Sequence, residues 1–244
     1  AIAIAFANEG AKVALTGRNV ERLEQVAAAI RVGGGLADSW RMDVSRETEV
    51  EEAVRKITER WGCIDILVNN AYNSSDAQRG GVLEVSEEQW QKDINSLVTS
   101  VYAGSKYAIP VMAATGGGSI VNISSIAALE AYPHVAYKTM KTAIIALTQN
   151  LASAHADAGV RVNAILPGFM NTPMAIEPRV AQGTPREEIV AMRNARVPLG
   201  EQMGTAWDVA YAALFLHSDE ARFISGVWLP VDGATWASQG KNLW

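Results

Sequence analysis

Short apolar runs alternate with longer stretches of helical periodicity along most of the chain. The short runs are bounded by Gly, Pro, Asn, Asp or Ser, as buried strands are. In the longer stretches, apolar residues recur three and four positions apart, which is typical of amphipathic helices. This alternation predicts βαβ units and therefore a parallel sheet covered by helices.

The expected elements follow from the same pattern. Strands are predicted over 12–16, 36–42, 64–69, 119–125, 161–166 and 226–231. The chain starts within a helix that ends at Gly10, and further helices are predicted over 20–32, 46–61, 86–112, around 137–147, from 185 and over 205–217. Ser86 and Thr184 are expected to cap two of these helices, because a Gln or Glu follows each of them three positions later.

We expect one domain over residues 1–244, an α/β fold with a doubly wound, Rossmann-type parallel sheet and helices on both faces, because no repeat or linker divides the chain. Such sheets bind ligands at the carboxyl ends of their strands. The distinctive polar residues stand at those ends: Gly17-Arg18, Asp43, Asn69-Asn70, Ser124-Ser125 and Pro167-Gly168.

Composition narrows the functional classes. The net charge of −5 gives no reason to expect nucleic acid or an anionic membrane as a partner, and no apolar run is long enough to span a membrane. Cys63 is the only cysteine, which suits the cytoplasm. The three histidines are scattered along the chain, so no metal site is expected.

Tyr137 and Lys141 lie four positions apart in a helical pattern, so they share one face of that helix. A cation beside a phenol favours the phenolate and lowers its pKa from about 10, which makes Tyr137 a candidate general acid or base. Taken alone, the pair also fits an ordinary amphipathic helix.

Several motifs together resemble the short-chain dehydrogenase/reductase family over essentially the whole chain. The matching segments are Asp65–Ala71 (DILVNNA), Ile120–Ser125 (IVNISS), Tyr137-x-x-x-Lys141, Arg161–Gly168 (RVNAILPG) and Val231–Gly233 (VDG). The resemblance implies an NAD(P)-dependent oxidoreductase that moves a hydride between the cofactor and a small carbonyl or alcohol substrate.

The resemblance also implies roles for single residues. Tyr137 would exchange a proton with the substrate oxygen, Lys141 would hold the nicotinamide ribose, and Asn95 would help to retain a relay water. Counting along the strand makes Ser125 the catalytic serine, whereas counting back from Tyr137 indicates Ser124. We favour Ser125, because a loop absorbs a deletion more readily than a strand does.

Arg18 indicates which cofactor is preferred. Gly17 stands where an acidic residue would bind the ribose hydroxyl of NAD, and Arg18 follows it as a phosphate binder. We therefore expect NADP(H), with NAD(H) as the alternative. The resemblance implies further cofactor contacts: Asp43, Val44, Asn69, Ala71, Pro167, Gly168 and Thr172. Asp43 also fits a plain helix cap.

The glycine-rich phosphate loop of the family does not occur in the sequence. The first helix resembles the one that normally follows that loop. We therefore expect the first strand and the glycine-rich turn of the fold to lie outside this sequence. Backbone amides at that turn form the cradle for a pyrophosphate.

The sequence says less about the substrate than about the cofactor. Tyr72, which replaces the family's glycine after Ala71, and Tyr132 are candidate pocket walls, although Tyr72 also fits a surface loop. The resemblance makes residues 169–200 a substrate lid, with Phe169 and Met174 as further pocket candidates. Four lid arginines fit either an anionic substrate or a solvated surface: Arg179, Arg186, Arg193 and Arg196.

The family commonly forms homotetramers, which we expect here. Two other functions stay open: a non-redox relative of the halohydrin dehalogenase type, and a non-catalytic nucleotide-binding scaffold. Lys141 argues against the first, because that type has an arginine at this position. The intact set of Asn95, Ser125, Tyr137 and Lys141 argues against the second.

Overall fold

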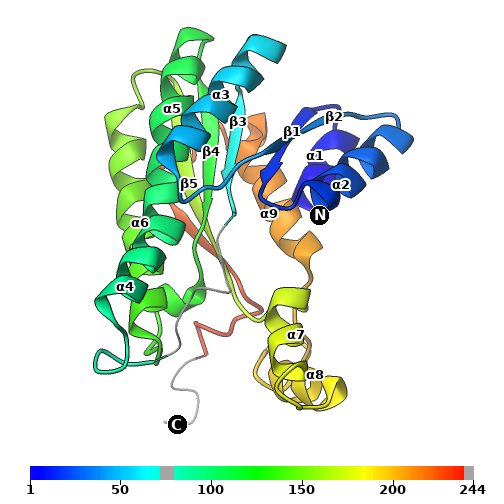
Figure 1. The fold of residues 1–244 in the computed structure, drawn as a ribbon, viewed down its shortest axis with the longest axis vertical. Coiled ribbons are helices and arrows are strands. Elements are labelled where there is room, and N and C mark those ends of the chain that lie inside the picture. Colours follow the sequence, from blue (N-terminus) through cyan, green and yellow to red (C-terminus); the bar gives the residue numbers. More distant parts are fainter. Residues whose placement is uncertain (72–79, 239–244) are drawn as a thin grey trace.

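The computed structural model describes residues 1–71 and 80–238. In this part of the chain the strands form two parallel sheets, one of order β1-β2 and one of order β3-β4-β5-β6 (Figure 1). The predicted α/β class with parallel pairing is confirmed. The strands are β1 (Lys12–Gly17), β2 (Leu36–Arg41), β3 (Ile66–Asn69), β4 (Gly118–Ile123), β5 (Val160–Pro167) and β6 (Trp228–Val231).

The helices alternate with these strands along the chain. They are α1 (Ile2–Asn8), α2 (Val20–Val32), α3 (Glu47–Trp61), α4 (Glu87–Ile94), α5 (Ser100–Ala114), α6 (Val135–Ala154), α7 (Pro173–Val180), α8 (Arg186–Asn194) and α9 (Ala206–His217). Three short turns complete the described elements: the π-helical η1 (Asn95–Thr99) and the 3₁₀ turns η2 (Ile126–Ala128) and η3 (Asp219–Ala221).

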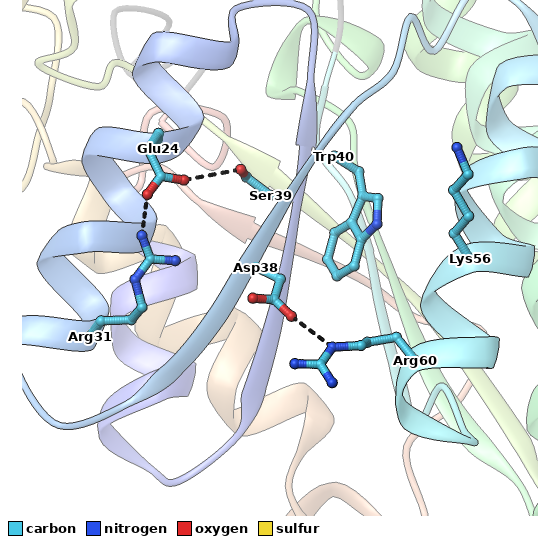
Figure 2. Close-up of a pocket in the computed structure, with 7 residues that line it drawn as sticks. All are labelled: Glu24, Arg31, Asp38, Ser39, Trp40, Lys56 and Arg60. Atoms are coloured by element: carbon cyan, nitrogen blue, oxygen red, sulfur yellow. Dashed lines mark hydrogen bonds and ion pairs between the residues drawn. The ribbon is translucent and has the colours of Figure 1, made fainter.

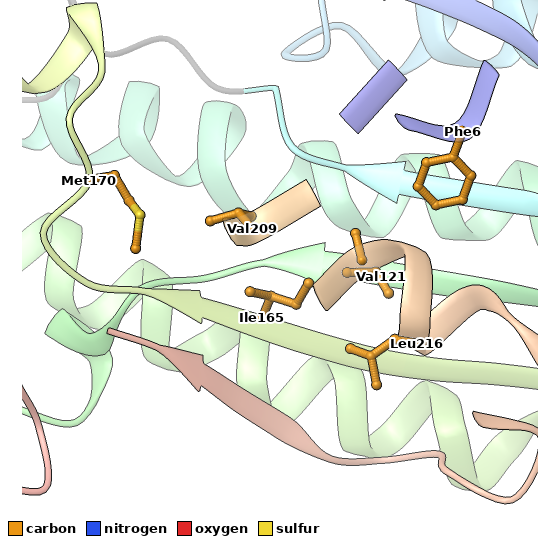
Figure 3. Close-up of a cluster of buried hydrophobic side chains, with 7 residues drawn as sticks. Phe6, Val121, Ile165, Met170, Val209 and Leu216 are labelled. Atoms are coloured by element: carbon orange, nitrogen blue, oxygen red, sulfur yellow. The ribbon is translucent and has the colours of Figure 1, made fainter. Parts of the chain in front are cut away.

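Helices cover both faces of the four-stranded sheet. On one face, Met112 of α5 and Ala152 of α6 pack with Ile120 of β4 and Val162 of β5. On the other face, α9 and α1 share a cluster with β4 and β5 that includes Phe6, Val121, Ile165, Val209 and Leu216 (Figure 3). Burying one side chain of this size contributes about 1.5–3 kcal/mol.

Helix α1 connects the two sheets. Its Phe6 belongs to the cluster under β4 and β5, whereas its Ala7 packs with Ala27, Ile30 and Ala37 beneath the β1–β2 pair. Gly10, with φ +87°, ends this helix as predicted, because glycine enters the left-handed region without a steric penalty.

The long helix predicted over 86–112 begins as expected. The Ser86 side chain accepts a hydrogen bond from the Gln89 amide at 3.2 Å and caps α4. The helix is then interrupted by the π turn η1 before α5 continues. Turns of this type insert a residue and are frequent near functional sites. Apolar periodicity carries over such a turn, so the pattern predicted one helix.

Two expectations for the segment after β5 were incomplete or wrong. Helix α7 was not predicted, since Pro178 lies within it and masks the helical pattern. Thr184 does not cap α8: this helix begins at Arg186 and has Pro185 at the N-cap position without a side-chain cap. Proline takes the extended conformation there, which leaves Thr184 outside the helix.

Arg161 of β5 anchors the end of α9. Its guanidinium donates to the carbonyl of Leu216 at 2.7 Å and to that of Ile224 at 3.2 Å. A cation at this position satisfies helix carbonyls that have no partner within the helix. These hydrogen bonds hold the C-terminal end of α9 against the start of β5.

His217 lies beside this anchor and is buried, with Phe6 edge-on to its ring at 5.4 Å. Neither ring nitrogen has a hydrogen-bond partner among the described residues. Burial, followed by the positive charge of Arg161, lowers the pKa of His217 to about 3. The folded protein therefore keeps this imidazole neutral throughout the physiological range.

We expect His217→Leu to make the protein less sensitive to acid. The unfolded chain protonates His217 below its ordinary pKa of about 6.5, whereas the folded chain does not, so the wild type loses stability as the pH falls towards 3. Between pH 7 and about 5.5 the wild type should lose about 1 kcal/mol more than the variant, measured as the free energy of unfolding in urea. Equal losses would show that this imidazole is solvated in the folded protein.

Candidate active site

The carboxyl ends of the parallel strands bring most of the predicted residues to one edge of the fold. β4 leads directly into Ser124 and Ser125, and its partner β5 ends at Pro167. Asn69 ends β3 in register with Asn122 of β4. Helix α6, which carries Tyr137 and Lys141, packs against β4 and β5.

Lys141 joins α6 to the end of β4. Its side chain is buried, and the ammonium donates to the carbonyl of Ile123, the last residue of β4, at 2.9 Å. In return, the Ser124 hydroxyl donates to the backbone carbonyl of Lys141 at 2.7 Å. Burial lowers the pKa of Lys141 to about 8, so most of the ammonium stays charged at neutral pH.

These contacts separate the roles of the two serines. Ser124 is buried and its hydroxyl binds α6, whereas Ser125 is half-buried and its hydroxyl oxygen accepts from the Ala127 amide at 3.2 Å. A serine hydroxyl that accepts in this way still has its proton to donate. The geometry therefore leaves the Ser125 hydroxyl, rather than that of Ser124, available to a substrate oxygen.

Tyr137 lies one helical turn before Lys141. The Lys141 nitrogen is 5.7 Å from the centroid of the Tyr137 ring, so the predicted pairing on one helix face is confirmed. The Tyr132 ring lies 5.6 Å from that of Tyr137, and His134 packs edge-on against Tyr132 at 5.3 Å. Tyr132 therefore packs beside the candidate acid, and its role as a pocket wall stays a prediction.

The loop between Ser125 and Tyr137 is held from below by α6. The Lys138 ammonium donates to the carbonyls of Ala127, Ala128 and Glu130, and the Thr142 hydroxyl donates to that of Ala128 at 3.1 Å. Sequence reasoning missed Lys138, which reads as one more surface lysine. These bonds fix the loop that carries Ser125 relative to Tyr137.

A hollow of about 270 Å³ lies at the carboxyl ends of β1 and β2. Four of the residues expected to bind the cofactor line it, namely Arg18, Asp43, Val44 and Ala71. The other lining residues are Gly17, Met42, Ser45, Lys92, Asn95 and Ser96. Among these, Ser45, Lys92 and Ser96 were not anticipated, because polar residues in turns and on helices usually face solvent.

The groups around Asp43 in this hollow favour its ionised form. Its side chain accepts hydrogen bonds from the Ser45 hydroxyl at 2.7 Å and from the Ser45 amide at 3.0 Å. Burial alone would raise the pKa of Asp43, but these bonds and the charges of Arg18 and Arg46 outweigh it and lower that pKa. Asp43 thus provides a fixed acceptor next to a cation.

Asn69 was expected to border the cofactor, but its side chain is turned to the interior. Its amide donates to the Asn122 side chain at 2.9 Å, and Asn122 donates to Thr148 of α6 at 2.9 Å. Ala71 does line the hollow. Asn69 therefore links three elements below the site, and its side chain is not among those that line the hollow.

Asn95 lies at the start of η1 and lines the same hollow as Arg18 and Asp43. Its side-chain oxygen accepts from Gln91 at 3.2 Å, and η1 packs against α6. Asn95 thus lies beside the hollow that Arg18 and Asp43 line. Its role in a proton relay stays a prediction.

The end of β5 is closely packed. The Gly168 amide donates to Val231 at 3.0 Å, and a Cβ at Gly168 would lie 2.6 Å from the Cβ of Asp232, so only glycine fits there. Pro167 precedes it in β5, and Thr172 begins α7 without a capping hydrogen bond of its own. These three predicted cofactor contacts occupy the junction between the sheet and the lid.

Residues 169–200 form a compact unit with a small core of its own. Ile176 of α7 and Ile189 of α8 are fully buried in it, and Phe169 packs against this cluster. Met174 is about half exposed on α7. Tyr72, the remaining pocket candidate, lies outside the described residues.

A larger hollow of about 510 Å³ lies elsewhere, between α2, β2 and α3 (Figure 2). None of the predicted site residues lines it. Its charged groups are all paired: Glu24 with Arg31, and Asp38 with Arg60 at 3.2 Å, whereas Lys56 pairs with Glu52 outside the hollow at 3.1 Å. Side chains that neutralise each other leave little to recognise a ligand, so we place the candidate site at the strand ends.

Two classes of feature are missing from the part of the chain that the structure covers. Within residues 1–71 and 80–238, no group of three or more His, Cys, Asp or Glu side chains could hold a metal ion. Across the same ranges, no helix is long and apolar enough to cross a membrane.

Comparisons with known proteins agree with this geometry. The sequence model of the family described as enoyl-(acyl carrier protein) reductase matches residues 1–234. The chain is 37% identical to the 2,5-dichloro-2,5-cyclohexadiene-1,4-diol dehydrogenase LinX of Sphingobium indicum, covering 93% of this chain and 87% of that protein. It is 36% identical to the 2-(R)-hydroxypropyl-CoM dehydrogenase of Xanthobacter autotrophicus, covering 96% and 92%.

The fold has equally similar relatives of known structure. A putative short-chain dehydrogenase/reductase from Burkholderia xenovorans superimposes with a TM-score of 0.91 at 36% identity, covering 97% of this chain and 89% of that one. Both sequence and structure therefore lead to one conclusion: this chain belongs to the short-chain dehydrogenase/reductase family of NAD(P)-dependent oxidoreductases that act on alcohols and carbonyls.

Proposed function

We propose that the protein transfers a hydride between NADP(H) and a carbonyl or secondary alcohol, with Tyr137 as the general acid or base. The observation that carries this proposal is the pairing of Tyr137 and Lys141 on α6, fixed to the end of β4 beside Ser125. Several similar proteins are named as dehydrogenases of hydroxylated small molecules, which supports the same reaction class.

The chain's own groups supply the proton and the orientation. In reduction, the Tyr137 hydroxyl gives its proton to the substrate oxygen; in oxidation, it takes the proton back. The Lys141 ammonium near the ring favours the ionised phenol. The Ser125 hydroxyl donates to the same substrate oxygen and fixes its position. The nicotinamide, when bound, supplies or accepts the hydride.

The preference for NADP(H) rests on the hollow at the ends of β1 and β2. Arg18 and Lys92 place two cations along its wall, and Asp43, the acidic residue there, is already engaged by Ser45. Such a lining fits a ribose phosphate better than a ribose hydroxyl, because guanidinium binds phosphate through two parallel hydrogen bonds. The polar and small residues of the hollow fit the adenosine end of the cofactor.

We also propose that the protein is a homotetramer and that α9 contributes to its interface. Trp207, Tyr211 and Phe215 recur every four residues on α9, and they are 39%, 61% and 41% exposed. An exposed aromatic stripe of this kind is usual for a surface that a partner covers.

Replacing Tyr137 by Phe should lower kcat/KM by about 100- to 10,000-fold, because the variant keeps the ring and loses the proton. Loss of nicotinamide absorbance across a panel of ketones and aldehydes measures turnover, and fluorescence titration measures NADPH binding, which should change little. Tyr102→Phe, at an exposed position of α5, is the matched control and should retain most of the activity. Full turnover by Tyr137→Phe would exclude this residue as the acid.

Replacing Arg18 by Ala should raise the KM for NADPH by about 10- to 100-fold, the loss expected for charge-assisted hydrogen bonds to phosphate. The KM for NADH should stay within about twofold, because NADH has no phosphate at that position. Arg22→Ala, one turn into α2, is the control. Equal effects on the two cofactors would contradict the NADP(H) preference.

Replacing Tyr211 by Glu should reduce the assembly to a smaller species, because the charge would be buried at the proposed interface. Sedimentation equilibrium of the full polypeptide measures the mass. Gln25→Glu adds the same charge on the exposed face of α2 and should leave the assembly unchanged. A monomeric wild type would rule out the tetramer.

A further inference from the structure

Two arginines of residues 169–200 pack against one aromatic ring, and a third interacts with one of them electrostatically. The guanidinium carbons of Arg193 and Arg196 lie 4.9 and 4.5 Å from the centroid of Phe169. Arg193 is near the end of α8, and Arg196 follows that helix. Arg179, near the end of α7, is close enough to Arg193 to interact with it electrostatically. Helices α7 and α8 and the segment after α8 thus contribute the three cations of this cluster.

No carboxylate compensates these charges within the described residues. The acidic Glu177 of the lid pairs with Arg186 instead. Arg179 donates to the Ala175 carbonyl at 2.8 Å, and the Arg193 Nε donates to the Met203 sulfur at 3.3 Å, so neither contact neutralises a charge. Like charges held this close repel each other and favour a bound anion.

Arg193 is also partly withdrawn from water. Burial, followed by the positive charges of Arg179 and Arg196, lowers the pKa of Arg193, whereas Tyr132 opposes this change. Withdrawing a cation from water without a partner costs free energy, and an anion in the same place would recover it. On a solvated helix face, by contrast, the three guanidinium groups would spread apart into water.

The cluster lies next to the catalytic pair. Arg193 interacts with Tyr132, and the Tyr132 ring is 5.6 Å from that of Tyr137. Phe169 itself follows Gly168 directly after β5, so the two guanidinium groups packed on its ring lie at the strand ends. Tyr132 and Phe169 also give this region apolar side chains, which suits a short hydrocarbon segment.

The stem of the lid holds the cluster in place. Phe169 accepts a hydrogen bond from the Gly204 amide at 3.0 Å, and the Asn171 amide donates to Gly204 at 2.7 Å. At the other end, the Leu199 amide donates to Gly233 at 3.1 Å. Because both ends are fixed to neighbouring segments, the arginines keep a defined position relative to the strand ends.

We propose that Arg193, with Arg196 and Arg179, binds an oxyanion at the end of the substrate remote from the reacting carbon. The preferred substrate is then a carbonyl compound with a short apolar segment that ends in a carboxylate, sulfonate or phosphate. This inference rests on the proposed hydride transfer for the identity of the reacting group, but the anion site itself does not depend on turnover.

The test compares matched acids and esters on the full polypeptide. With NADPH, 5-oxohexanoate should be reduced with a kcat/KM at least about tenfold above that of its methyl ester. Arg193→Gln, and separately the exposed Arg196→Gln, should lower kcat/KM for the acid by about 10- to 100-fold, mainly through KM, and leave the ester within about twofold. Arg186→Gln, on the same helix but paired with Glu177, should change neither. Equal rates for acid and ester, or equal losses on both, would overturn the proposal.

A binding measurement separates this proposal from the proposed reaction. Calorimetric titration should detect hexanoate and not hexanamide, and Arg193→Gln should remove hexanoate binding. If no carbonyl compound is reduced while hexanoate still binds in this selective way, the hydride transfer fails and the anion site stands. If hexanoate and hexanamide behave alike, the anion site fails whatever the turnover.

Discussion

The pair of hydrogen bonds between α6 and the end of β4 positions the rest of the site. Lys141 donates to the Ile123 carbonyl through its side chain, and its own carbonyl accepts from Ser124. A buried ammonium is costly unless it is hydrogen-bonded, so this geometry is strongly favoured over its alternatives. Tyr137 stands one turn earlier on the same rigid helix, and Ser125 is the next residue of the strand end. The positions of Tyr137 and Ser125 therefore depend on the hydrogen bonds made by Lys141 and Ser124.

A second polar connection lies deeper and supports the first. Asn69, Asn122 and Thr148 form a chain of hydrogen bonds from β3 through β4 to α6. A Cβ at Gly104 would lie 2.4 Å from the Asn69 side-chain oxygen, so α5 approaches this chain as closely as glycine allows. Buried polar groups that are mutually satisfied define one register, since any slip would leave them unpaired. The chain thus fixes the strand ends on which the reacting groups depend.

The sequence predicted the elements well where a single periodicity operated. Within the described residues, each of the six strands was predicted to within two residues at both ends, and α2 and α9 begin and end almost where expected. The apolar pattern failed to predict elements where proline or an inserted residue changes the backbone locally. Pro178 masked α7, Pro185 displaced the cap from Thr184, and the π turn at Asn95 is invisible to a pattern of apolar residues.

The site residues also divide into those that local spacing predicts and those that depend on distant contacts. The Tyr137–Lys141 pair could be predicted, because helical spacing alone sets their common face. The inward turn of Asn69 could not, since it depends on partners on β4 and α5 that are distant in the chain. From the sequence, only the count along the strand favoured Ser125 over Ser124; the hydrogen bond from Ser124 to α6 supplies a physical reason.

Two cationic regions flank the catalytic pair in a protein whose net charge is −5. Arg18 and Lys92 line the hollow at the ends of β1 and β2, and Arg193 and Arg196 lie at Phe169. An overall negative surface with local positive regions concentrates anions where the cations are. In the proposed reaction, binding the remote end of the cofactor and the remote end of the substrate would limit how their reacting groups can meet. Both remote contacts would therefore help to orient the reaction at Tyr137. In the proposed reaction, the arginines of residues 169–200 would thus select a substrate through a charge that takes no part in the chemistry.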